Sequence, residues 1–394
     1  MALAHPWMGR GGSEQRVMRM IEALAGQYDL TLITCGPVDL DGLNAAYETA
    51  VRVEDLRVLR APLPWWIRPL LRFDAVRGSW YARFCKRVAD RFDVLISTYN
   101  AIDFGRPAIQ CIADFCFDDA LRRELHGSPV GWRRWLYQDN FLRRAYRRFC
   151  RFLAGPRSGR DPAGDLYLAT SDWSGEMMRQ RHGATCRTVY PAVADAYPDG
   201  DDERIESGFI CLGRIVIEKR IERIIEILQR VRDAGHDVHL HVVGPVGNTA
   251  YARRIESLCE SRADWVTLAG GVFGEAKRRL LTSHRYGIHA CQGESFGAAV
   301  AEMVKAGCIP LVSEVGGPAE IVQHPALVFS GVDDAVAKVT AVLKDAALRD
   351  ELRKHLKRRG ECFSVERFRQ EMRAVVREFF VAQAAQTARR EGSA

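Results

Sequence analysis

Two carboxylates, separated by seven residues, stand in the stretch GESFGAAVAE at 293–302. Glu294 precedes a Ser-Phe-Gly turn, and Glu302 falls in the alanine-rich segment that follows it. The turn lies between YGIHAC, which reads as a buried strand, and FGAAVAEMVKAG, whose spacing predicts a helix that ends at Gly307. Gly297 would let the free amides at the start of this helix approach an oxygen-rich ligand closely.

These residue types suit the binding of hydroxyl groups. A carboxylate early in the helix can hold a pair of vicinal hydroxyls, as on ribose, and Glu294 in the loop can accept hydrogen bonds from sugar hydroxyls. The alternative for Glu302 is an ordinary acid of the first helical turns, favoured there by the helix dipole.

Two further loops carry residues that could bind an anionic ligand. GRIVIEKR, 213–220, follows the apolar run FICL, and its Arg214 and Lys219 could hold a diphosphate, the arginine bidentately and the lysine as a point charge. GRGGSE, 9–14, leads into a helical pattern, and Gly12 would let backbone amides approach a phosphate or carboxylate. The alternatives are a solvated surface network for the first loop and ordinary turn glycines for the second.

The elements that would position these loops alternate along the chain. From residue 165 onward, continuous apolar strands are separated by helical patterns of ten to fifteen residues, which is typical of a doubly wound parallel α/β sheet. The N-terminal half fits the same class less cleanly, and MALAHP leaves only a stub of a first strand, from which we expect a shortened sheet edge or a start that lies upstream. Ligands bind at the carboxyl ends of such strands, so two domains of this kind predict a site in the cleft between them.

We therefore predict two Rossmann-like domains that face a central cleft, with a hinge between them. The expected ranges are 1–185 for the N-terminal, acceptor-side domain, 186–208 for the linker, 209–364 for the C-terminal, nucleotide-sugar-binding domain, and 365–394 for a helix that packs back on the N-terminal domain.

Composition excludes several classes of protein. The chain has 394 residues with 47% hydrophobic and 27% charged content, as in globular proteins, and no apolar stretch reaches the length of a membrane span. Its eleven cysteines are scattered without paired spacing, which indicates reduced thiols in a cytoplasmic protein and no metal site. His239 and His241 share a strand face, and we interpret them as strand histidines, not metal ligands.

Positive charge is concentrated in residues 121–160. This segment holds eleven arginines against Glu124 and Asp139, a net charge of +9 in a chain whose total is +7. The arginine pairs alternate with aromatic and leucine residues at helical intervals, which would suit a helix lying on an anionic membrane surface. A core-packing helix with a solvated basic face is the alternative, and the absence of an accompanying binding module argues against nucleic acid.

The combination of these motifs resembles a known family. GESFGAAVAEMVKAGCIPLVSEVGGPAEIV is similar to the donor-site signature of family 4 glycosyltransferases, the retaining GT-B enzymes, in which two glutamates are separated by seven residues. GGSE, TSDWS, GRIVIEK and this block follow the family's order over residues 9–325, and EMVKAGCIPLV is most similar to the branch that acts on lipid-linked oligosaccharides.

The resemblance implies roles for individual residues in a metal-independent transfer that needs no cofactor, the nucleotide sugar being a substrate. Arg214 and Lys219 would neutralise the donor diphosphate, Glu294 would contact the donor sugar and Glu302 would hold the ribose. Further donor contacts are expected from Gly12, Gly271, Val272, Ser295, Phe296, Gly297 and Ala298.

One departure from the family pattern concerns CIADF, 111–115. Many relatives have a histidine before the aspartate, near the reacting carbon of the donor sugar, whereas this chain has Ala113 followed by Asp114. Asp114 is our candidate for the missing role. The sequence therefore predicts a retaining hexosyltransferase that uses GDP-mannose or a UDP-hexose and a glycan or lipid-linked acceptor, with a GT-B epimerase or a non-catalytic, donor-binding partner subunit as alternatives.

Overall fold

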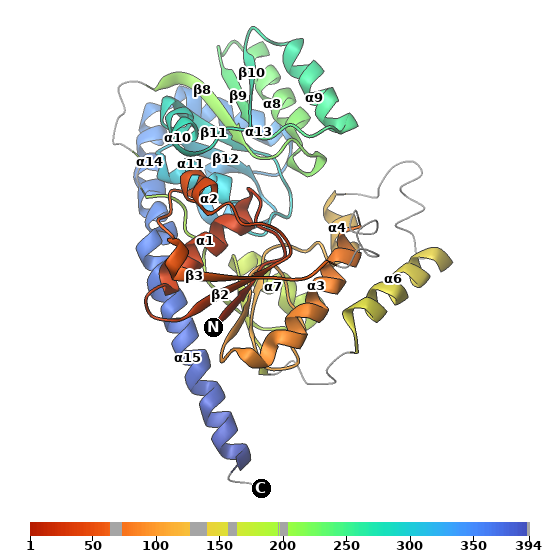
Figure 1. The fold of residues 1–394 in the computed structure, drawn as a ribbon. Coiled ribbons are helices and arrows are strands. Elements are labelled where there is room, and N and C mark those ends of the chain that lie inside the picture. Colours follow the sequence, from red (N-terminus) through yellow and green to blue (C-terminus); the bar gives the residue numbers. More distant parts are fainter. Residues whose placement is uncertain (64–72, 127–139, 157–163, 196, 198–203, 392–394) are drawn as a thin grey trace.

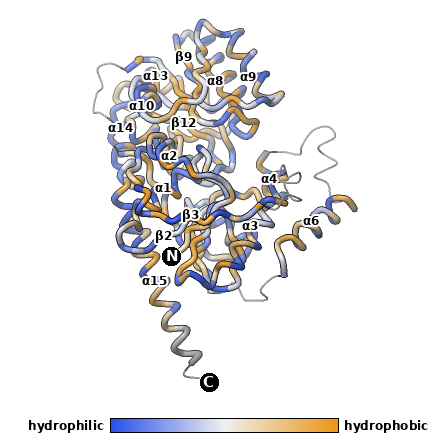
Figure 2. The backbone as a smooth tube through the Cα atoms, viewed as in Figure 1, coloured by the Kyte–Doolittle hydropathy of each residue, from blue (hydrophilic) through white to orange (hydrophobic). Residues whose placement is uncertain are grey.

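The protein folds into two α/β domains, each with its own parallel sheet (Figure 1). The computed structural model describes residues 1–391 except for 64–72, 127–139, 157–163, 196 and 198–203. The strands of both sheets are largely hydrophobic, whereas the surrounding helices alternate between hydrophobic and hydrophilic stretches (Figure 2). This is the pattern of a sheet buried on both faces.

The N-terminal sheet has seven strands in the order β3-β2-β1-β4-β5-β6-β7. Every pairing in it is parallel, and the strands are β1 (Ala2–Ala4), β2 (Leu30–Thr34), β3 (Leu56–Arg60), β4 (Leu95–Ser97), β5 (Ile109–Ile112), β6 (Leu166–Ala169) and β7 (Cys186–Thr188). Its helices are α1 (Gly12–Leu24), α2 (Leu40–Tyr47), α3 (Asp74–Val88), α4 (Asp119–His126), α6 (Phe141–Ala154) and α7 (Asp172–His182).

The short first strand lies at the centre of this sheet. β1 pairs with β2 on one side and β4 on the other, and its three residues are fully buried. The expectation of a shortened sheet edge was therefore wrong. Three residues suffice because both neighbouring strands hydrogen-bond to them.

The C-terminal sheet has six strands in the order β10-β9-β8-β11-β12-β13. They are all parallel and comprise β8 (Ile205–Leu212), β9 (His239–Val243), β10 (Val266–Gly270), β11 (His284–His289), β12 (Ile309–Ser313) and β13 (Val328–Phe329). The helices of this domain are α8 (Ile221–Asp233), α9 (Ala250–Glu260), α10 (Gly274–Ser283), α11 (Ala298–Lys305), α12 (Gly317–Val322), α13 (Val332–Lys344) and α14 (Ala346–Gly360). The segment between the two sheets is 189–204, because β7 and the start of β8 fall inside the range 186–208 expected for the linker.

The last helix, α15 (Val365–Glu391), follows the C-terminal domain but packs on the N-terminal one, and its far end projects beyond that domain (Figure 1). Its buried residues share a core with α1, and Arg373 Nε donates to Ala23 O over 2.7 Å. The apolar face of α15 consists of Phe368, Met372, Val375, Val376 and Phe379. The chain therefore crosses between the domains twice, through 189–204 and into α15.

Both sheets reverse their strand order at one internal point. In the N-terminal sheet this switch point lies between β1 and β4, and in the C-terminal sheet it lies between β8 and β11. Loops that follow the strands at a switch point diverge to opposite faces of a sheet and leave a crevice for ligands. GRGGSE lies beyond β1, GRIVIEKR beyond β8, and GESFGAAVAE beyond β11.

Candidate active site

A cleft of about 800 Å³ lies between the two domains. Most of the residues predicted from the sequence line it, from both sides: Gly12, Asp114, Arg214, Lys219, Glu294, Ser295, Phe296, Gly297 and Ala298. Gly271, Val272 and Glu302 are not among the lining residues.

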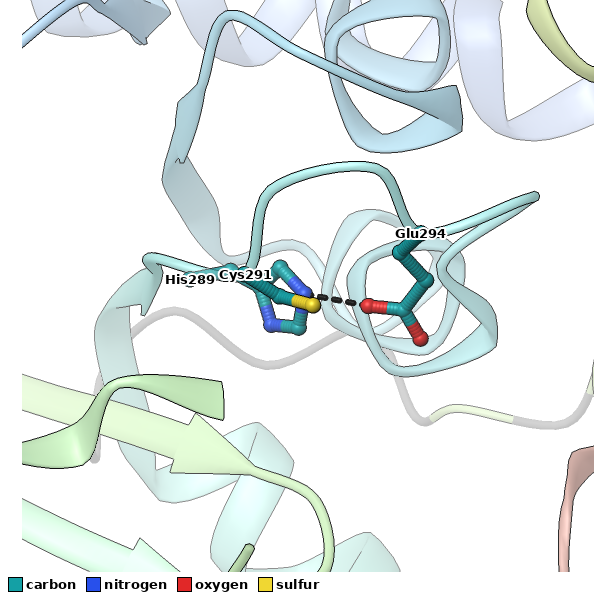
Figure 3. Close-up of side chains that lie close together, drawn as sticks. All are labelled: His289, Cys291 and Glu294. Carbon is teal, nitrogen blue, oxygen red and sulfur yellow. Dashed lines mark hydrogen bonds and ion pairs between the residues drawn. The ribbon is translucent and has the colours of Figure 1, made fainter. Parts of the chain in front are cut away.

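Glu294 is held from two sides in this cleft. Lys219, the last residue of a 3₁₀ turn (Ile217–Lys219) after β8, places its Nζ 2.8 Å from Glu294 Oε1. His289, the last residue of β11, places its Nε2 2.5 Å from Glu294 Oε2 (Figure 3). The two carboxylate oxygens thus each have one partner, and the plane of the carboxylate is fixed.

The Lys219–Glu294 pair is ionised. Burial on its own raises the pKa of Glu294, but Lys219 and His289 outweigh burial and hold that pKa well below its usual range. Burial on its own lowers the pKa of Lys219, and the Glu294 carboxylate outweighs it and raises that pKa. The side chains are 17% and 23% exposed, so a ligand can still reach both.

His289 was missed by the sequence analysis. It belongs to no motif that we considered, and the available signal was its place at the carboxyl end of a strand next to a switch point. Its side chain is only 2% exposed, which is consistent with a supporting role behind Glu294.

His289, Cys291 and Glu294 also form a potential metal-ligand group (Figure 3). Their ligand atoms lie within 4.8 Å of one another, a combination of nitrogen, sulfur and oxygen that suits zinc. The sequence spacing predicted no such group. The fit is poor, however, because the Lys219 ammonium already neutralises the carboxylate, and we derive no chemistry from a metal here.

Arg214 is the second predicted cation of this wall. It is exposed in the cleft and forms no ion pair among the residues that the structure describes. Its guanidinium is therefore available to an anionic ligand, in contrast to Lys219.

Close backbone approach explains the glycines at the start of α11. Gly297 has φ +99°, and a Cβ there would lie 2.8 Å from Pro318 Cγ. Across the cleft, a Cβ on Gly12 would lie 3.9 Å from Ala298 Cβ, so the two predicted glycine loops face each other directly. Ser171 Oγ, at the start of α7, donates to Ser295 O over 2.5 Å and joins the domains beside this point.

Asp114 is surrounded by neutral donors. Its carboxylate accepts from Tyr99 Oη at 2.8 Å, Asn100 Nδ2 at 2.9 Å and Cys116 N at 3.0 Å. Burial on its own raises the pKa of Asp114, but these hydrogen bonds outweigh it and lower that pKa. Asp114 is therefore an anion at neutral pH and a weak base.

Glu302 does not itself line the main cleft, as we predicted it would, but its partner Gln15 does. Its side chain is 6% exposed, pairs with Lys277 Nζ at 2.8 Å and accepts from Gln15 Nε2 at 3.4 Å. These residues line a separate small cavity between the domains. Lys277 comes from α10, and its position against α11 could not be read from the sequence.

A known family model matches the C-terminal domain. Residues 205–361 match the family model described as Glycosyl transferases group 1. The match spans both loops that contribute Lys219 and Glu294. The C-terminal domain is therefore a glycosyltransferase group 1 domain.

Solved structures resemble the chain over almost its whole length. WaaG, a glycosyltransferase involved in lipopolysaccharide biosynthesis, is 14% identical with a TM-score of 0.64, covering 94% of this chain and 97% of that one. HepE from Anabaena, solved with UDP and glucose, is 13% identical with a TM-score of 0.65 and coverage of 96% and 99%. Sucrose-phosphate synthase from Thermosynechococcus elongatus is 17% identical with a TM-score of 0.69 and coverage of 97% and 99%.

These likenesses establish the fold as GT-B, two Rossmann-like domains with helices around them, as predicted. No match was found among curated proteins.

The ionised pair predicts how stability depends on pH. A carboxyl whose pKa is lowered in the folded state stabilises the protein above its unfolded pKa and loses that effect as pH falls toward the folded value. We expect wild type to be more stable than Glu294→Gln, which leaves Lys219 unpaired, by a constant margin between pH 6 and pH 8. The margin should shrink as the pH falls below about 4.5. Urea unfolding of both proteins at each pH measures this difference in stability. A difference that already shrinks between pH 8 and pH 6 would contradict a lowered pKa for Glu294.

Proposed function

We propose that the protein is a retaining, metal-independent hexosyltransferase of glycosyltransferase family 4. It would transfer a sugar from a nucleotide-sugar donor to a glycan or lipid-linked acceptor. The observation that carries the proposal is the ionised Lys219–Glu294 pair, steadied by His289, in a cleft between two Rossmann-like domains.

The donor would bind mainly to the C-terminal wall. Arg214 is free to take the diphosphate bidentately, and Lys219 can share its charge between Glu294 and the phosphates. The amides at the start of α11, preceded by Gly297, face the same cleft and favour an anion. Glu294, with one lone pair per oxygen still unused, would accept hydrogen bonds from the donor sugar.

The reaction would rely on charge stabilisation. In a retaining transfer the leaving diphosphate and the incoming hydroxyl share one face of the sugar, and stabilising the leaving group supplies most of the acceleration. Asp114, an anion held by neutral donors, would face the positive charge that develops on the sugar ring.

The donor and acceptor classes rest on similarity. HepE was solved with UDP and glucose, and WaaG is involved in lipopolysaccharide biosynthesis. They support a UDP-hexose as donor and a polysaccharide or lipid-linked glycan as acceptor, whereas GDP-mannose is a donor that only the sequence resemblance implies. Glu302 binds Lys277 and Gln15 through Oε1, so its Oε2 would accept from the ribose hydroxyls, and Gly271 and Val272 would lie near the base.

The direct test is nucleotide release. The full chain should release nucleotide from one class among UDP-, GDP- and ADP-sugars, and faster with its acceptor. Arg214→Gln should lower kcat by about 100- to 1,000-fold, because the leaving phosphate loses a cation. The control Arg254→Gln removes an exposed arginine of α9 outside the cleft and should leave kcat unchanged.

A non-catalytic, donor-binding subunit is the second candidate, because Ala113 lines the cleft where relatives have histidine. His5 does not replace that histidine, since it is fully buried, bonds to Thr98 and does not line the cleft. Donor binding without nucleotide release, with every acceptor tried, would decide for this candidate. Epimerisation of the donor without transfer would decide for an epimerase.

We further propose that the enzyme works in the cytoplasm, peripherally on an anionic inner membrane face. α6 lies beside α3 (Figure 1), and its hydropathy alternates along the helix (Figure 2). It packs on α3 through Cys150 and Leu153, yet exposes a second apolar face. The residues exposed there are Phe141, Leu142, Phe149 and Phe152, with exposed fractions of 81%, 54%, 38% and 74%. All eleven cysteines are free thiols, as is usual in a reducing compartment.

The positive charge beside the exposed apolar face of α6 supports the binding of an anionic lipid surface there. Arg143 and Arg147 pair with Asp119 of α4, whereas the exposed Arg148 and Arg151 form no ion pair among the described residues. Aromatic residues beside free arginines suit anionic headgroups. Trp132, Trp135 and Leu136, which belong to the basic, aromatic segment 121–160, lie outside the described residues. Within the described part of the chain, no helix is long and apolar enough to span a bilayer.

Vesicle sedimentation tests the membrane proposal. The protein should sediment with phosphatidylglycerol vesicles at low salt and be released by added salt, because the attraction is partly electrostatic. The double variant Phe141→Ser with Phe152→Ser should weaken binding by about ten-fold or more, since it removes two exposed apolar anchors. Val381→Ser, at a 66% exposed position on α15, is the matched control. Equal binding of all three proteins, or none by wild type, would refute the proposal, and binding to duplex DNA in place of vesicles would identify a nucleic-acid surface.

A further inference from the structure

Arg16 is a buried cation without a carboxylate partner. It belongs to α1, is 5% exposed and lines the cleft. Its Nη2 donates to Thr98 O over 2.5 Å, and its Nε has no hydrogen-bond partner. Arg16 takes part in no ion pair among the residues that the structure describes.

Arg19, one turn further along the same helix, shows the usual arrangement. It is equally buried and its Nε also has no partner, but its Nη1 pairs with Glu22 at 2.8 Å and its Nη2 donates to Tyr47 O at 2.9 Å. A buried charge without a partner is costly, so a group that completes it is expected. For Arg16, which faces the cleft, that group can come from a ligand.

Asp114 lies near Arg16 on the N-terminal wall of the cleft but forms no ion pair with it. Burial lowers the pKa of Arg16, while the neighbouring Cys111 and Asp114 oppose this, and the guanidinium stays protonated. Asp114 is satisfied by Tyr99, Asn100 and Cys116 and forms no ion pair with Arg16. Asp114 therefore leaves Arg16 available.

Further cations line the same wall. Arg77 pairs with Asp74 and lies over the Trp7 ring at 4.3 Å, whereas Arg10 and Arg122 form no ion pair among the described residues. Glu14, Asp74 and Asp114 also line this wall, so its four arginines leave a net charge of +1, and this surplus favours an anion.

We propose that Arg16 anchors an anionic group, a phosphate or a carboxylate, carried by the acceptor. This inference rests on the proposed transferase function and narrows its acceptor to a negatively charged one. The donor diphosphate offers the same chemistry, but Arg214, Lys219 and the start of α11 are positioned for it on the opposite domain. Arg16 bonds to Thr98, just beyond β4, on the acceptor side.

Calorimetry with inorganic phosphate tests the site. The full chain is first saturated with UDP or GDP, which fills the donor side, and phosphate is then titrated. Wild type should bind phosphate, and Arg16→Gln should weaken this binding by about 10- to 100-fold, the effect of one charge-assisted contact. Arg16→Lys should retain part of the affinity, and Arg123→Gln, an exposed arginine of α4 outside the cleft, should retain all of it. Asp114→Asn, which keeps Arg16 in place, should tighten phosphate binding by removing a nearby negative charge.

The outcomes separate this proposal from the function on which it rests. Unchanged phosphate binding in Arg16→Gln, or none by the nucleotide-saturated wild type, would overturn the acceptor site. Weaker binding of UDP or GDP in Arg16→Gln, with no phosphate bound beside the nucleotide, would assign Arg16 to the donor. Failure of wild type to bind any nucleoside diphosphate would refute the proposed function, and phosphate titration of the free chain would still report on Arg16.

Discussion

The architecture of the cleft depends on the ion pair between Lys219 and Glu294. Their charges are largely buried, and each is stable there because the other compensates it. The pair joins the loop after β8 to the loop after β11, the two strands at the switch point of the C-terminal sheet. With these loops held together, α11 begins beside the pair, and its first amides face the same space as Arg214.

The N-terminal domain supplies the opposite wall, and several contacts hold it in place. Ser171 bonds to Ser295, and Glu320 of α12 accepts from the amides of Asp172 and Trp173 at the start of α7, at 2.9 and 3.0 Å. α15 returns from the C-terminal domain to the core around α1. The cations, amides and ionised pair of the C-terminal wall therefore face Arg16 and Asp114 on the N-terminal wall, an arrangement suited to stabilising charge as it moves.

Local sequence patterns predicted the strands and helices of the C-terminal domain well because its strands contain short, largely buried apolar runs and are followed by helical patterns. β3 escaped prediction because only one of its five side chains is buried, as befits an edge strand. Most of the predicted site residues line the cleft because the loops that follow parallel strands meet at one edge of a sheet. Arg16 stayed hidden because its partner Thr98 lies 82 residues away along the chain. His289 lies only five residues before Glu294 but belongs to no recognised pattern, and the pairing of Glu302 with Lys277 could not be foreseen because Lys277 comes from another helix.

A double-mutant cycle on nucleotide-sugar affinity tests the central claim most directly. Lys219→Met, Glu294→Gln and the double variant would be titrated by calorimetry with the nucleotide sugar that wild type binds. If the two residues bind the donor as one ionised unit, each single variant has a lower affinity for the nucleotide sugar than wild type. The affinity of the double variant is then no lower than that of the single variant that binds more weakly. The coupling should then lie at about 0.5–3 kcal/mol. Strictly additive losses, or a single variant with wild-type affinity, would contradict the account.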